Sequence, residues 1–298
     1  MEDYKIYNNF KDYKIYNNFK DYEIYNNLKV PKDSNIILRL DGRNFHTLAN
    51  KISLKKPYDK LFSMTMVDTS KDIFNEFAPL FIYTFSDEIN ILLSEIPFSG
   101  RIEKLNSVFP SLASSSFLKH LNRYFSSNED EKSIIDDEKS IIDNEKFSNE
   151  DEKSINNEKS IIDNENIIIS FDSRLIPIAN NKDIVKYFKW RQDESWRNCV
   201  NSYGYWTLRQ EFSKDIATEK LKNLKSSDIH ELLFEKGSNL NDVVTYQKRG
   251  IAIYKYKEKI TGFNPKINDK DVSYRNRLYV DKDLATFDEN FFKKINII

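Results

Sequence analysis

Two apolar runs separated by only three residues constrain the fold of this chain more than any other feature. LFIYTF (80–85) and INILLS (89–94) lie on either side of Ser86, Asp87 and Glu88. Short apolar runs bounded by polar turn residues are typical of strands, and so short a connection predicts a hairpin. The chain must therefore build part of its core on an antiparallel pair of strands.

The segments around this hairpin alternate between strand and helix patterns. An apolar run at 35–40 predicts a buried strand, and helical spacing over 59–77 predicts a helix that ends before Pro79. The order strand, helix, hairpin, helix, strand predicts an α+β fold of the split βαβ type, with helices on one face of an antiparallel sheet. The other predicted elements are a helix at 104–125, a strand at 166–175 and an aromatic-rich helix at 182–212.

The composition excludes several kinds of protein. Cys199 is the only cysteine, so neither a disulfide framework nor a cysteine-built zinc site is possible. Neither GxGxxG nor GxxxxGK[ST], the glycine-rich phosphate-binding motifs, occurs. Because the chain has no apolar stretch of about 18 residues and no signal peptide, we expect a soluble cytoplasmic protein without a membrane span.

Two repetitive segments lie outside this pattern. DYKIYNNFK occurs twice within residues 1–20 and returns as DYEIYNNLK at 21–29, directly before the first strand. We interpret residues 1–20 as a duplicated N-terminal repeat. Residues 127–166 hold 14 acidic residues and 5 lysines, a net charge of −9, in recurring EKSIID units. This composition predicts a low-complexity acidic insert at 127–165, disordered or transiently helical, with a partner-binding helix as the alternative.

Acidic side chains follow the predicted strands. Asp41 and Gly42 end the first strand, and Asp87 and Glu88 occupy the hairpin turn. Neighbouring strands lie about 4.8 Å apart, which is comparable to the spacing of about 3.5–4 Å between two catalytic metal ions. Oxygen ligands on short side chains suit Mg²⁺. Aspartate also favours turns after strands, so ordinary turn residues remain the alternative.

Basic and aromatic residues could contact a nucleotide or an RNA. Lys56 and Lys104 could each bind phosphate, although lone lysines are commonly solvated surface residues. The segment WRQDESWRNCVNSYGYW (190–206) interleaves aromatic side chains with arginine and amide donors, which suits phosphate contact and base stacking. A core helix with satisfied polar residues is the other interpretation. The candidate RNA-binding residues are Arg191, Gln192, Arg197 and Asn198.

Seven motifs follow one another along the chain: RLDGRNFH, KPYDKLF, FSDEI, EKLNSV, FDSRL, YFKWRQDE and HELLFEKGSNLND. In this order they resemble the motifs of the tRNA-His guanylyltransferase family, the 3′-to-5′ polymerases. The resemblance runs from about residue 22 to 256, broken by the acidic insert. It implies a polymerase-like palm domain formed by 21–126 and 166–256, which includes tRNA-binding helices, with a helical C-terminal extension at 257–298.

The resemblance also implies a site and a reaction. Asp41, Gly42 and Asp87 would hold two Mg²⁺ ions, with Glu88 beside them as a further catalytic residue. ATP would adenylylate the 5′-phosphate of tRNA-His, and the 3′-hydroxyl of GTP would then attack it. Family members are usually homotetramers. The implied nucleotide-binding residues are Asp41, Gly42, Arg43, Asn44, Phe45, His46, Lys56, Asp59, Ser86, Asp87 and Lys104.

One departure affects the predicted substrate. WRNCVNSY (196–203) stands where the eukaryotic branch has HINNLYNT, and it resembles the archaeal and bacterial branch. Members of that branch add nucleotides by pairing with a template, so general repair of 5′-truncated tRNAs is an alternative function. Two further alternatives are an inactive RNA-binding module and a nucleotide cyclase with similar carboxylates.

Overall fold

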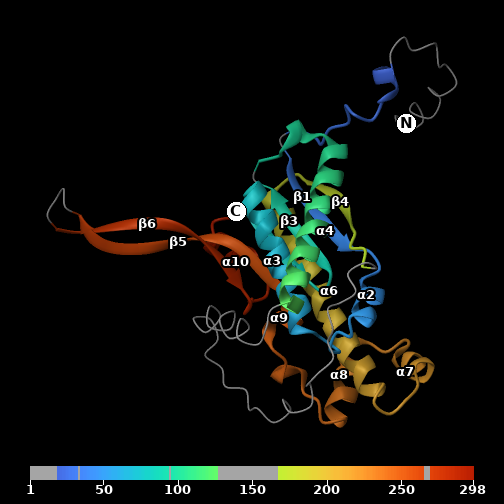
Figure 1. The fold of residues 1–298 in the computed structure, drawn as a ribbon. Helices are drawn as coiled ribbons and strands as arrows, with labels where there is room; N and C mark the ends of the chain where they lie inside the picture. The colour runs from blue at the N-terminus through green and yellow to red at the C-terminus, as the bar shows by residue number, and fades with distance from the viewer. Residues whose placement is uncertain (1–18, 33, 94, 127–166, 265–268) are drawn as a thin grey trace.

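The computed structural model describes residues 19–32, 34–93, 95–126, 167–264 and 269–298. Its centre is a six-stranded sheet in the order β4-β1-β3-β2-β5-β6, in which every neighbouring pair is antiparallel (Figure 1). The predicted α+β class and hairpin are confirmed. The strands are β1 (Asn35–Gly42), β2 (Phe81–Phe85), β3 (Glu88–Leu93), β4 (Phe171–Ile178), β5 (Ile251–Asn264) and β6 (Asp269–Asp281).

Alternating side chains of the strands build two separate cores. Ile36, Leu38 and Leu40 of β1 point to one face, where α3 (Lys60–Phe77) and α4 (Ile102–Ser126) cover them. Ile37 points to the other face and packs with α6 (Asn181–Leu208). The prediction of helices on one face only is therefore wrong, because the central strands are apolar on both sides and each side must be covered.

Smaller helices extend α6 and connect the strands. α2 (Phe45–Lys51) follows β1 directly and was not predicted. The helices α7 (Lys214–Leu221), α8 (Ser226–Glu235) and α9 (Thr245–Arg249) pack beside α6, and Leu233 and Leu240 are buried in a third, smaller core there. The 3₁₀ turns are η2 (Phe19–Tyr22), η3 (Phe98–Gly100) and η6 (Leu240–Asp242).

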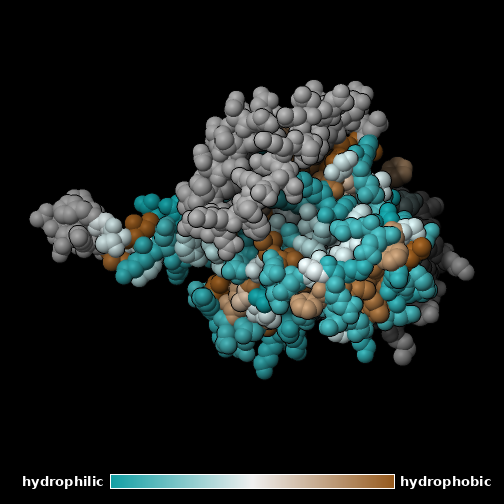
Figure 2. Space-filling model, turned by 90° about the horizontal axis from the view of Figure 1, so that it is seen from below, coloured by the Kyte–Doolittle hydropathy of each residue, from teal (hydrophilic) through white to brown (hydrophobic). Residues whose placement is uncertain are grey.

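The last part of the chain corrects a second prediction. The described residues of 257–298 are not mainly helical, because β5 and β6 form a two-stranded arm that projects from the body (Figure 1) and α10 (Glu289–Lys294) is the one α-helix among these residues. The predicted domain boundary at 256 falls inside β5. The arm carries exposed apolar side chains among hydrophilic ones (Figure 2), including Val272 and Tyr274. None of the described side chains of 255–262 and 272–280 is buried, so this part of the arm contributes nothing to the core.

Residues 1–18 and 127–166 lie outside the described residues. The predicted acidic insert at 127–165 and all but the last two residues of the predicted N-terminal repeat at 1–20 therefore lie outside them as well. In the part of the chain that the structure does describe, no helix is long and apolar enough to cross a membrane.

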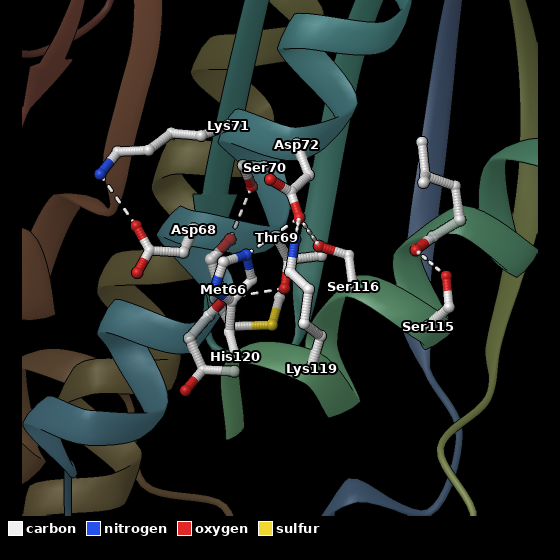
Figure 3. Close-up of polar contacts among 12 residues, drawn as sticks. Met66, Asp68, Thr69, Ser70, Lys71, Asp72, Ser115, Ser116, Lys119 and His120 are labelled. Atoms are coloured by element: carbon white, nitrogen blue, oxygen red, sulfur yellow. Dashed lines mark hydrogen bonds and ion pairs between the residues drawn. The ribbon is translucent and has the colours of Figure 1, made fainter. Parts of the chain in front are cut away.

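A cluster around one carboxylate joins α3 to α4 (Figure 3). Asp72 Oδ2 accepts hydrogen bonds from Ser116 Oγ at 2.5 Å and Lys119 Nζ at 2.5 Å, and His120 Nε2 lies 2.9 Å away. Partial burial opposes ionisation of Asp72, but the hydrogen bonds from Lys119, Ser116 and His120 outweigh it and lower its pKa below the ordinary 3.8. The charged carboxylate therefore holds the two helices together.

We expect Asp72→Asn to lower the free energy of unfolding by about 1 kcal/mol at pH 7, because the lost hydrogen bonds are partly exposed to solvent. A depressed pKa contributes stability above the ordinary pKa, and this stability is lost as the pH falls through the folded-state value. The difference between the two proteins should therefore shrink below about pH 4. Urea denaturation at pH 7 and pH 3.5 measures it. Ser115→Ala is the matched control, since the Ser115 hydroxyl donates to the carbonyl of Leu112 within its own helix.

Candidate active site

The sheet brings the predicted carboxylates to one edge. Asp41 near the end of β1 is the register partner of Glu88 at the start of β3. The backbone N–H of Gly42 donates to the carbonyl of Asp87 at 3.0 Å. The predicted proximity of Asp41 and Asp87 is thus confirmed, because β1 and β3 are neighbours and run in opposite directions.

Burial dominates the electrostatics of the two aspartates, and Arg39 and Arg174 offset only part of it at Asp41. Burial raises the pKa of Asp87 to about 6, and the charge of Asp41 adds to the effect. Burial also raises the pKa of Asp41. The negative charges of Glu88 and of Asp172, its register partner on β4, raise this pKa further. A divalent cation would relieve this repulsion, and carboxylate oxygens are the donors that Mg²⁺ prefers. The residues present therefore fit the predicted ion.

The protein alone supplies few ligands at this edge. Within the described ranges, no group of three or more His, Cys, Asp or Glu side chains is placed to hold a metal ion. A cation bound by Asp41 and Asp87 would therefore complete its shell with backbone carbonyl, water or substrate phosphate oxygens. Mg²⁺ usually binds in this way, through one or two carboxylates and its substrate.

Glu88 differs from the two aspartates. It is buried, and both of its oxygens accept hydrogen bonds from Arg191, from Nε to Oε1 at 2.8 Å and from Nη2 to Oε2 at 2.6 Å. Asn90 Nδ2 donates a further bond to Oε1 at 2.8 Å. The structure thus gives Glu88 a structural ion pair in place of the predicted catalytic contact.

A cavity of about 400 Å³ opens beside Asp87. This volume lies within the range of about 300–1,000 Å³ that is typical of small-molecule sites. Helix α6 and helix α9 form its far wall. Of the predicted residues, the cavity is lined by Phe45, His46, Lys56, Asp59, Ser86, Asp87 and Asn198.

Two of these residues come from the loop before α3. Asp59 caps α3, because its Oδ1 accepts from the N–H of Phe62 at 3.1 Å and its Oδ2 from the N–H of Lys55 at 2.9 Å. Lys56 Nζ lies 5.9 Å from the centroid of the Trp206 ring. Burial lowers the pKa of Lys56, partly offset by Asp59. The Lys56 ammonium group of this loop and the Trp206 indole ring of α6 thus lie together on the cavity wall.

The remaining predicted nucleotide residues, Asp41 among them, lie outside the cavity lining. Arg43, Asn44 and Lys104 are exposed. Gly42 is buried, and a Cβ there would lie 2.7 Å from the ring of Phe45. The small size of Gly42 is therefore needed by the packing of Phe45, a reason that the sequence alone did not indicate.

Two of the four residues predicted to contact RNA are buried in this structure. Arg191 is only 7% exposed and is bound to Glu88, and Gln192 is 4% exposed. Gln192 donates to the carbonyl of Ala285 at 3.1 Å and accepts from the N–H of Phe287 at 2.7 Å, so it fastens the C-terminal segment to α6. Arg197 is exposed and pairs with Glu194.

Several cavity residues were missed as site residues. Tyr205 and Trp206 belong to the aromatic segment that the sequence singled out, so their pattern could have placed them. Tyr246 and Gln247 come from α9, a helix of 5 residues with no motif of its own. Only the tertiary structure brings α9 against α6.

Comparison with known proteins agrees with this arrangement. A family model described as "tRNAHis guanylyltransferase" matches residues 16–179, and a second, "Thg1 C terminal domain", matches residues 182–289. A probable tRNA(His) guanylyltransferase of Bos taurus is 26% identical over 233 residues, which are 76% of this chain and 66% of the bovine protein. The tRNA(His) guanylyltransferase of Debaryomyces hansenii is 27% identical over 227 residues, 74% of this chain and 73% of that protein.

Solved structures share the fold. A bacterial tRNA(His) guanylyltransferase (Thg1)-like protein in complex with ATP matches with a TM-score of 0.64 and 21% identity, and the match covers 94% of this chain and 96% of that one. The Saccharomyces cerevisiae tRNA(His) guanylyltransferase matches with a TM-score of 0.57 and 22% identity over 76% of this chain and 87% of the yeast chain. Since the two family models together span most of the sequence, this chain belongs to the tRNA-His guanylyltransferase family of nucleotidyltransferases.

Proposed function

We propose that this protein adds a guanylate to the 5′ end of tRNA-His, with the nucleotide bound in the cavity beside Asp87. The observation that carries the proposal is the closeness of Asp41 to Asp87, which lines a cavity that Lys56 lines as well. A bacterial relative of the same fold was solved with ATP and also with GTP, which supports a nucleoside triphosphate as the ligand here.

In the proposed reaction, the RNA 5′-phosphate first attacks ATP and displaces pyrophosphate. The 3′-hydroxyl of GTP then attacks the adenylylated 5′-phosphate and displaces AMP, which leaves a guanylate with a 5′-triphosphate that is trimmed afterwards. Each step transfers a phosphoryl group with its substituent from one oxygen to another. The attacking oxygens belong to the substrates, so no side-chain nucleophile is required. The protein's task is to position the two oxygens and to offset the developing charge.

Two Mg²⁺ ions would be held by Asp41, Asp87 and the Gly42 carbonyl. When bound, such ions offset phosphate charge and activate the reacting oxygens. Lys56 would bind a phosphate, and His46, Ser86 and Asn198 would orient the nucleotide by hydrogen bonds. Trp206 and Tyr205 offer ring faces on which a base could stack.

The tRNA would contact exposed groups outside the cavity, among them Arg197, Arg43 and Lys104. We further propose a homotetramer in the cytoplasm as the working form. Sedimentation of the purified protein tests the oligomeric state.

The experiment uses 5′-monophosphorylated transcripts of tRNA-His and of one other tRNA, each without its first nucleotide. Each transcript is incubated with Mg²⁺, ATP and labelled nucleotides. We expect guanylate to be added to tRNA-His alone. Extension of both tRNAs, each with the nucleotide complementary to its own 3′ strand, would instead identify a general 5′-end repair polymerase. Absence of any incorporation would contradict both.

A further inference from the structure

Arg191 and Glu88 form a nearly fully buried ion pair next to Asp87. Their side chains are 8% and 7% exposed, and the guanidinium meets the carboxylate through two parallel hydrogen bonds of 2.8 and 2.6 Å. This forked geometry fixes both partners, because a guanidinium presents its donors in one plane. The pair is therefore rigid as well as buried.

Neighbouring groups lock the pair on every side. Asn90 Nδ2 donates to Glu88 at 2.8 Å, and Tyr187 donates its hydroxyl to Asn90 Oδ1 at 2.6 Å. The Arg191 guanidinium carbon lies 4.5 Å from the Trp190 ring centroid and 5.4 Å from that of Phe85. These aromatic faces favour a cation in this position. Helix α6 thus supplies a fixed positive charge to the end of β3.

The position of the pair gives it a consequence for the site. Glu88 follows Asp87 in sequence and is one register partner of Asp41, whose other register partner is Asp172, so four carboxylates lie at this edge. Arg191 cancels the charge of one of them and occupies its oxygens. The carboxylates left for the proposed cation are those of Asp41 and Asp87, of which Asp87 lines the cavity.

We propose that Arg191 is a positioning residue that withholds Glu88 from the cation, so that Asp41 and Asp87 supply the carboxylates that bind it. The inference rests on the proposed cation site. Without Arg191, Glu88 would be a third, uncompensated carboxylate that draws the cation away from the position facing the nucleotide. Without Glu88, the unpaired guanidinium would repel the cation.

The test measures Mn²⁺ binding by the full-length, nucleotide-free protein, with free Mn²⁺ followed by electron paramagnetic resonance. Arg191→Met should tighten Mn²⁺ binding about tenfold and Glu88→Gln should weaken it about tenfold, because a nearby unit charge of either sign is left unpaired. The double variant carries a neutral pair of similar shape, and its affinity should return to within about threefold of the wild-type value. Guanylate transfer by Arg191→Met should fall about 100-fold even though the cation binds more tightly.

Controls separate positioning from a merely structural role. Lys189→Met removes an exposed charge of the same helix and should leave Mn²⁺ affinity unchanged. A merely structural pair would lower thermal stability in both single variants without opposite shifts in affinity, and that result overturns the inference. If Arg191→Met does not fold, weakened binding by Glu88→Gln with recovery in the double variant supports the inference, and equal affinities overturn it. Wild-type protein that binds no Mn²⁺, or binds it equally well after Asp87→Asn, overturns the cation site itself and the inference with it.

Discussion

Asp87→Asn should abolish guanylate transfer and, in the absence of divalent cations, make the protein more stable at pH 7.5. The variant loses one of the two carboxylates proposed to hold the cation, so we expect transfer to fall by about 1,000-fold or more. It also removes a negative charge that burial and Asp41 make unfavourable. A group that supports catalysis at the expense of stability would behave in this way.

The pH dependence of stability follows from the raised pKa. Asp87 titrates at about 6 in the folded protein against an ordinary value of 3.8. Between these values the folded state binds a proton that the unfolded state lacks, so the free energy of unfolding falls as the pH rises from about 4 to 6. The loss amounts to at most about 3 kcal/mol and persists at higher pH. Asparagine carries no charge, so the variant does not suffer this loss of stability as the pH rises.

Urea denaturation in EDTA at pH 5 and pH 7.5, beside a transfer assay, measures both effects. Mg²⁺ should stabilise the wild-type protein and leave Asp87→Asn unchanged. Asp193→Asn, which removes an exposed carboxylate of α6, serves as the control. Retained transfer, or the same pH dependence in variant and wild type, would show that Asp87 is an ordinary turn residue.

Phe287→Ala should lower the free energy of unfolding by about 3–5 kcal/mol, because it truncates a buried core side chain. The side chain is fully buried between the sheet and α6, with its ring centroid 5.9 Å from that of Phe81 and 5.1 Å from that of Tyr83. Truncation leaves a cavity that the surrounding sheet cannot close.

Guanidinium denaturation of Phe287→Ala and of the wild-type protein measures this loss in the free energy of unfolding. Lys293→Ala is the exposed control in the same segment. A loss below about 1 kcal/mol would mean that the C-terminal segment is not part of the core. The expected loss would instead make residues 284–292 as necessary to the fold as the central strands. No pattern in the sequence of 257–298 indicated this.

The sequence by itself determined the central architecture and the pair of carboxylates. Apolar runs with short polar connections can be buried only as strands, and helical spacing over 59–77 and 182–212 allowed little else. Asp41 and Asp87 follow from the same reasoning, because antiparallel neighbours bring the end of β1 to the β2–β3 turn. Local chain geometry was sufficient for these features.

The tertiary structure alone decided which polar residues face the site. Arg191 and Gln192 looked like RNA-binding donors because both are polar residues of an aromatic helix. Whether such a donor meets solvent or another side chain depends on which elements pack around the helix. The sheet placed Glu88 against Arg191, and the C-terminal segment placed its backbone against Gln192. The cavity wall from α9 and the arm of β5 and β6 likewise depend on contacts between segments distant in sequence, which local periodicity does not encode.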